Sequence, residues 1–261
     1  MGKHVAALVL VASILIGGVL MPDAPDGGKY QLQGSKDTLA DLGELAARID
    51  ARDTWDRRGQ VIWYDRFEGG LAPWSVIGSG TGYGVTVDAS KAEWAGYSAL
   101  LTAGSNAAKY AGIYRFFAPP EVNKWGAELG VAFTTEYDYF TLNIQRFDGV
   151  NRHWAILAIN NTEDAIKILL DDSTYLKVSD LPNSLSTDIL FHQIKLVIDI
   201  DTGRYVRAMF DDIELDLSDY SYQQVLSGGI HCQKIMAYFH GRSGNNDTAN
   251  IGHMIVTVGE P

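Results

Sequence analysis

Residues 204–217, RYVRAMF-DD-IELDL, decide the fold of this 261-residue chain. Two runs of alternating side chains are joined there by a two-residue polar turn, Asp211-Asp212, and this combination is typical of a β-hairpin. Fourteen such runs follow one another between residues 60 and 258, with no convincing helix among them. The sequence therefore predicts an all-β fold in which residues 60–261 form one antiparallel jelly-roll β-sandwich.

The predicted strands are separated by Asp-Gly, Asn-Asn, Asp-Asp and Asp-Thr-Gly segments, which favour tight turns. They cover residues 60–67, 83–87, 98–102, 110–118, 125–134, 139–147, 153–159, 165–170, 175–178, 191–200, 204–210, 213–217, 230–240 and 250–258.

Composition excludes some classes of protein. A content of 46% hydrophobic and 20% charged residues is that of a globular domain with a sizeable core. The formal net charge of −11 disfavours contact with nucleic acid and with anionic membrane surfaces. Cys232 is the only cysteine, which excludes an intrachain disulfide and a cysteine-based zinc cluster. We expect its thiol to be buried and inert.

The first 21 residues form an apolar segment. Residues 5–21 are apolar behind a short basic start, as in a secretory signal or an uncleaved anchor. The same run also suits an apolar arm buried against neighbouring subunits, or an added strand of the sandwich. The sequence leaves these alternatives open, and membrane contact is expected only through residues 5–21 if they are retained.

A linker with one amphipathic helix is predicted between residues 22 and 59. The helix covers residues 38–49, and its apolar stripe contains Leu39, Leu42, Leu45 and Ile49. A single helix of about three turns is not stable alone, so it must dock on the sandwich or on another chain. These four residues are our candidates for assembly into a homo-oligomer or a larger particle.

Several motifs in the sandwich region resemble known families. The string DRFEGG at residues 65–70, followed by Trp74 and by GYSALL at residues 96–101, resembles the opening strands of jelly-roll carbohydrate-binding modules. Residues 191–199 and 202–206 resemble paired strands of concanavalin A-like and laminin G-like sandwiches, and residues 57–68 are similar to viral structural sandwich proteins. This resemblance implies a non-catalytic recognition domain outside the cell or on a virion, with Trp63 and Trp74 in its core.

The resemblance also implies a structural calcium ion, held by the Glu68 position and by an acidic pair at the start of the last strand. The chain has Asn250 to His253 where that pair would stand, so most of the ligand charge is missing. Asp199 and Asp201 have the density of a calcium loop but also suit an ordinary hairpin turn. We expect no cofactor, and calcium remains an alternative.

Laminarinase-type enzymes of this fold carry an E-x-D-x-x-E strand. The nearest string here has Glu136 and Asp138, but Thr141 replaces the third acid. Retaining glycosidases need two carboxyl groups about 5 Å apart. We therefore expect no enzyme, with a glycoside hydrolase as the less favoured alternative.

Aromatic residues in or beside the predicted loops are the remaining candidates for function. Sugars stack on aromatic faces, and the chain has 6 Trp and 13 Tyr. The candidates for carbohydrate binding are Tyr83, Trp94, Tyr97, Tyr137, Tyr139 and Trp154. The sequence thus predicts a surface protein whose loops contact a glycan or a protein, with a secreted carbohydrate-binding module as the alternative.

Overall fold

A computed structural model of the chain describes residues 56, 58–93, 96–105, 109–119, 122–182, 190–242 and 246–261. The described residues belong to one compact unit, residues 52–261, and form sixteen strands. The apolar segment 1–21 and the helix expected over residues 38–49 lie outside them, with the assembly candidates Leu39, Leu42, Leu45 and Ile49. Within these ranges no helix is long and apolar enough to cross a membrane.

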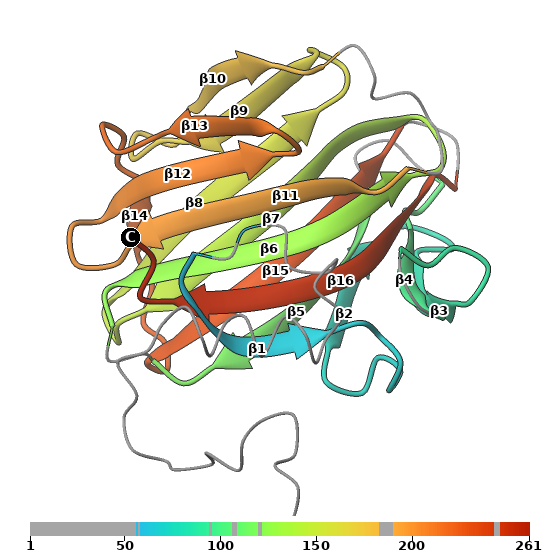
Figure 1. The fold of residues 1–261 in the computed structure, drawn as a ribbon, viewed down its shortest axis with the longest axis horizontal. Helices are drawn as coiled ribbons and strands as arrows, with labels where there is room; N and C mark the ends of the chain where they lie inside the picture. Colours follow the sequence, from blue (N-terminus) through green and yellow to red (C-terminus); the bar gives the residue numbers. More distant parts are fainter. Residues whose placement is uncertain are drawn as a thin grey trace, which may run out of the picture. The chain divides into compact units, whose positions relative to one another are not determined.

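The strands form two antiparallel sheets that pack face to face (Figure 1). Sheet A contains, in spatial order, β13 (Ile213–Asp216), β12 (Arg204–Phe210), β11 (His192–Asp199), β6 (Lys124–Phe133), β16 (Thr248–Val258), β4 (Ser98–Thr102) and β3 (Gly84–Asp88), while β1 (Gln60–Asp65) also pairs with β16. Sheet B contains β10 (Tyr175–Asp180), β9 (Ala165–Leu169), β8 (Asn151–Asn160), β7 (Tyr137–Phe147), β15 (Cys232–Gly241), β5 (Tyr110–Phe117) and β2 (Ser75–Ser79), while β14 (Gln223–Leu226) also pairs with β8. The predicted antiparallel jelly-roll β-sandwich is confirmed.

The hairpin predicted over residues 204–217 is present as β12 and β13. Phe210 pairs with Ile213 across the turn, where Asp211 has a positive φ of 48°. Its carboxylate fixes the turn to the neighbouring strand, because Asp211 Oδ1 accepts the backbone N–H of Gln193 at 2.8 Å. The fourteen predicted strands are all present, and the sequence reasoning missed β2 and β14. Both are short, and each pairs with one neighbour, so neither leaves a clear alternation in the sequence.

The core lies between the sheets and is built from the inward side of each alternating strand. Its largest fully buried apolar side chains include Phe67, Trp125, Phe133, Phe140, Phe210 and Phe239. Burying a side chain of this size stabilises the fold by about 1.5–3 kcal/mol relative to leaving it exposed. Core packing of this extent holds the sheets together without any intrachain disulfide, since the chain has a single cysteine.

The DRFEGG motif has a structural role. Asp65 Oδ1 accepts the backbone N–H of Phe67 at 2.8 Å, and Asp65 Oδ2 accepts the indole N–H of Trp74 at 2.8 Å. Trp74 is buried and meets the ring of Trp63 edge-on at 4.9 Å. The motif thus packs the first turn against the core. Trp74 lies in the core as expected, whereas Trp63 is half-buried and packs against it.

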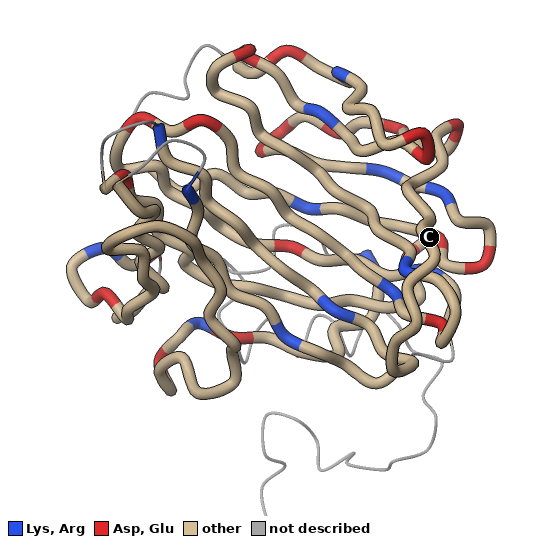
Figure 2. The backbone as a smooth tube through the Cα atoms, turned by 180° about the vertical axis from the view of Figure 1, so that it is seen from behind, with Lys and Arg blue, Asp and Glu red and all other residues tan. Residues whose placement is uncertain are grey.

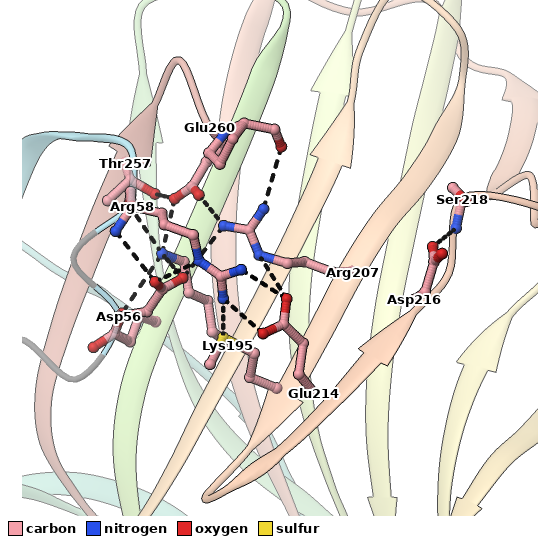
Figure 3. A network of polar contacts seen from close by, with 12 residues as sticks. Asp56, Arg58, Lys195, Arg207, Glu214, Asp216, Ser218, Thr257 and Glu260 are labelled. Carbon is pink, nitrogen blue, oxygen red and sulfur yellow. Dashed lines mark hydrogen bonds and ion pairs between the residues drawn. The ribbon is translucent and has the colours of Figure 1, made fainter.

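The outer face of sheet A is closed by a buried group of charges, which we call the ionic cluster (Figure 3). Lys195 of β11 is fully buried, and its Nζ lies 2.8 Å from carboxylate oxygens of both Asp56 and Glu260. Arg207 of β12 pairs with the same two acids, and Arg58 pairs with Asp56 and Glu214. The cluster joins the chain segments that precede β1 and follow β16, through Asp56 and Glu260, to strands β11 and β12 of sheet A.

Candidate functional site

The outer face of sheet B carries a continuous array of aromatic and polar side chains. Successive residues of a strand point to opposite sides of the sheet, so the strand register defines which residues share this face. They are Tyr110, Gly112, Tyr114 and Phe116 on β5, Cys232, Lys234, Met236, Tyr238 and His240 on β15, Tyr139, Thr141, Asn143, Gln145 and Phe147 on β7, and Arg152, Trp154, Ile156, Ala158 and Asn160 on β8.

Polar groups of β7 form the floor of this array. Thr141, Asn143 and Gln145 are buried although they lie on the outer side of the sheet. Asn143 donates a hydrogen bond to the Thr141 hydroxyl at 2.9 Å and accepts one from the indole N–H of Trp154 at 3.0 Å. These bonds fix the orientation of the Asn143 amide, so the floor is preorganised.

Aromatic side chains of β5 and β15 lie beside this polar floor. Tyr114 and Phe116 meet edge-on at 5.6 Å, and Tyr110 meets Tyr238 edge-on at 5.5 Å. A Cβ at Gly112 would overlap the Tyr238 ring, so the glycine leaves the ring room to lie across β5. Phe116 is the most open of these rings, with 53% of its surface exposed.

His240 extends the aromatic array at the opposite end from Phe116. Its ring stacks on Tyr139 with centroids 3.9 Å apart and lies 5.2 Å from Tyr110. Burial lowers the pKa of His240 to about 4, although the nearby Asp138 charge opposes this shift. The imidazole is therefore neutral at physiological pH and acts here as one more flat ring.

A pocket of about 410 Å³ opens beside Phe116 at the other end of the array. It is lined by Phe116, Phe147, Gly229, Ile230 and Cys232. Cys232 is half-buried and lines this pocket, which corrects the expectation of a buried thiol. Burial raises the pKa of the Cys232 thiol, so it stays protonated at neutral pH.

Two cationic residues are strand partners of residues that line this pocket, since Arg152 lies opposite Phe147 and Lys234 lies opposite Phe116. The Arg152 guanidinium carbon is 4.4 Å from the centre of the Trp154 ring, and Lys234 Nζ is 4.1 Å from the centre of the Tyr114 ring. Burial lowers the pKa of Lys234, and the positive charge of Arg152 lowers it further. Neither cation forms an ion pair within the part of the chain that the structure describes.

Two of the six aromatic residues predicted from the sequence lie in this array, Tyr139 and Trp154. Tyr137 does not, because it is only 1% exposed and stacks on Phe133 in the core at 4.0 Å. The register shifts between His240 and Gly241, so Tyr137 and Tyr139 point to opposite sides although they are two residues apart.

The loop candidates lie elsewhere. Tyr83 and Tyr97 precede β3 and β4 of sheet A and are 43% and 41% exposed. Trp94 lies outside the described residues. The sequence analysis did not predict Tyr114, Phe116, Tyr238 and the β7 amides, because its candidates were aromatic residues in or beside predicted loops. The available signal was the alternation of polar or aromatic residues with apolar ones inside the strands, as in YFTLNIQ at residues 139–145.

The calcium site implied by the family resemblance does not fit the described residues. Asp199 Oδ1 accepts the backbone N–H groups of Asp201 and Thr202 at 3.0 and 3.2 Å, which is an ordinary turn. The side chain of Asn250 donates to Asp88 and to Ser98, both at 2.9 Å. Glu68 is exposed, and no three His, Cys, Asp or Glu residues are placed to hold a metal in the described ranges.

The acids considered for catalysis are engaged in surface contacts. Glu136 forms an ion pair with Arg242, and Asp138 accepts a hydrogen bond from Thr162 at 2.7 Å. The strands of sheet B contain two acids, Asp138 and Asp180, and both lie near strand ends. As far as the chain is described, the centre of the array thus lacks the carboxyl pair that a glycosidase needs.

Comparisons with known proteins find similarity to solved structures but not to any family model or curated sequence. No protein-family model matches the sequence, and no curated protein matches it. Similar solved structures include peanut lectin (14% identity, 75% of this chain and 95% of that one, TM-score 0.47) and the carbohydrate recognition domain of Emp47p (9%, 77% and 97%, 0.46). The exoplasmic/lumenal domain of VIP36 is a third (13%, 73% and 86%, 0.44). Similarity at this distance concerns the arrangement of strands alone.

Proposed function

We propose that this protein binds a glycan on the outer face of sheet B and has no catalytic activity of its own. The observation that carries the proposal is the preorganised polar floor of β7 with aromatic rings on both of its sides. A sugar ring has apolar C–H faces and a rim of hydroxyls, so it needs this combination of flat aromatic surfaces and oriented amides. A site on rigid strands also loses little conformational entropy on binding.

The proposal distinguishes the strand face from the loops. Phe116→Ala and Trp154→Ala should each weaken binding roughly tenfold, which corresponds to about 1.4 kcal/mol of lost contact. Tyr83→Ala and Tyr97→Ala remove exposed rings of similar size from loops that precede strands of the other sheet, and these changes should leave binding unchanged. Affinity electrophoresis through gels that contain xylan, galactan, mixed-linkage glucan, polygalacturonate or alginate measures these differences. If the gel no longer retarded the Tyr97 variant but still retarded the Phe116 variant, the binding site would have to lie in the loops.

We also propose a setting for this activity, outside the cell or on a virion, with attachment through residues 1–59. The acidic charge and the apolar run at residues 5–21 support it. If that segment assembles the protein, the full chain should form a large oligomer, and a variant without residues 1–36 should be a soluble monomer. Light scattering on both forms tests this, and an unchanged mass per particle would remove the assembly role.

A further inference from the structure

The outer face of sheet B has a charge opposite to that of the whole protein. The net charge of the chain is −11, yet four of the five charged side chains that the strand register places on this face are cations, namely Arg152, Lys167, Lys177 and Lys234, and the fifth is Asp180 at the end of β10. Figure 2 views this sheet from outside and shows Lys and Arg positions along its strands, with most Asp and Glu positions in the surrounding turns. Such a separation of charge favours an anionic partner on this face.

Two of these cations are already neutralised within the protein. Lys167 pairs with Glu163, and Lys177 pairs with Asp180. Arg152 and Lys234 have no carboxylate partner in the described residues, and Arg152 Nε is buried without a hydrogen-bond partner there. Burying a donor without a partner destabilises the protein, so a ligand that supplies an acceptor would recover part of that cost.

The positions of Arg152 and Lys234 fit a charged sugar. Both lie against aromatic rings of the proposed site, Arg152 beside Trp154 and Lys234 beside Tyr114 and Phe116. The strand register places Gln145 between Lys234 and Trp154, the residue whose ring Arg152 contacts, since Gln145 pairs with Lys234 on one side and with Trp154 on the other. A ring that stacks here therefore has two cations within reach of a substituent.

We propose that the ligand of this face is an acidic polysaccharide whose carboxylate or sulfate groups are bound by Arg152 and Lys234. This inference rests on the proposed glycan binding and specifies its substrate class. A guanidinium fork and an ammonium group both form charge-assisted hydrogen bonds with such anions, and these are about twice as strong as neutral ones. The acidic surface elsewhere repels polyanions, so binding has to be local to this face.

Matched pairs of polysaccharides test the charge directly. The probes are polygalacturonate and its methyl ester, alginate and its propylene glycol ester, and heparin and desulfated heparin, each titrated calorimetrically against the full chain at fixed salt. We expect the acidic member of at least one pair to bind at least tenfold more tightly than its neutral counterpart. The uronate pairs and the heparin pair tell carboxylate from sulfate recognition.

Variants assign the effect to the two residues. Arg152→Gln and Lys234→Gln should each weaken binding of the acidic probe roughly tenfold. Lys177→Gln removes a charge from the same face but one that is already paired, so it should have no effect. Equal binding of acidic and neutral members, or unchanged affinity in both the Arg152 and Lys234 variants, would overturn the inference and leave glycan binding intact. If the protein bound neither these probes nor the neutral glycans named above, both proposals would be wrong.

Discussion

Lys195→Ala is expected to lower the free energy of unfolding by about 3–5 kcal/mol, because it leaves buried carboxylates without their cation. Lys195 is fully buried, and its Nζ contacts Asp56 and Glu260 at 2.8 Å, with Glu128 at 3.8 Å. Burial raises the pKa of Asp56, but the hydrogen bond from Arg58 and the charge of Lys195 outweigh it and hold that pKa well below its usual range. The Asp56 carboxylate is thus ionised at neutral pH and needs its partners.

Urea unfolding at pH 7, followed by tryptophan fluorescence, measures this loss. Lys177→Ala is the matched control, because Lys177 pairs with Asp180 on the surface and both side chains are largely exposed. Exposed pairs contribute at most about 1 kcal/mol. If the two variants lost equal stability, the ionic cluster would not have the structural role assigned to it.

Tyr205→Phe is expected to cost about 1–3 kcal/mol, although it removes a single oxygen atom. One edge of β8 pairs with β7, and the other edge pairs with β9 through residues 157–160 and with β14 through residues 151–154. Ile156 lies in the gap between β9 and β14 on this second edge. The Tyr205 hydroxyl fills this gap: it accepts the N–H of Ile156 at 3.0 Å and donates to the carbonyl of Leu169 at 2.7 Å. Phenylalanine would leave that buried N–H without a partner.

The comparison variant is Tyr222→Phe, measured by the same unfolding experiment. Among the residues that the structure describes, the Tyr222 hydroxyl makes one hydrogen bond, a longer one of 3.2 Å to the carbonyl of Asp199. Tyr222→Phe should therefore lower the free energy of unfolding by less than Tyr205→Phe does. An equal or larger loss for Tyr222→Phe would contradict the role of Tyr205 in bridging the broken edge of β8.

The sequence was sufficient for features that depend on local patterns. The β12–β13 hairpin follows from side-chain alternation on both sides of Asp211 and Asp212, and the same pattern located most other strands. β14 was missed because its four residues are held by pairing with β8 and carry no periodicity of their own. Local patterns therefore predict strands wherever one side of the strand is buried.

The site depended on information that local patterns do not contain. Phe116, Lys234, Gln145 and Trp154 come from four strands and become neighbours only through the strand register. Tyr137 was a candidate because it flanks the predicted turn at Glu136–Asp138, but a one-residue shift in pairing, which cannot be read from alternation, turns its ring into the core. The ionic cluster likewise joins Asp56 to Lys195, which lie far apart in the chain.

Methyl NMR of the methionines tests the central claim, glycan binding on the outer face of sheet B, most directly. The strand register places Met236 on that face, beside Tyr114 and Asn143, whereas Met209 lies beside Arg58 at the ionic cluster of sheet A. The full chain, labelled at its five methionine methyl groups, is titrated with a polysaccharide that retards it in affinity electrophoresis. We expect the Met236 signal to shift with saturation while the Met209 signal stays in place. A Met236 signal that does not move at saturation, or a shift confined to Met209, would contradict the claim.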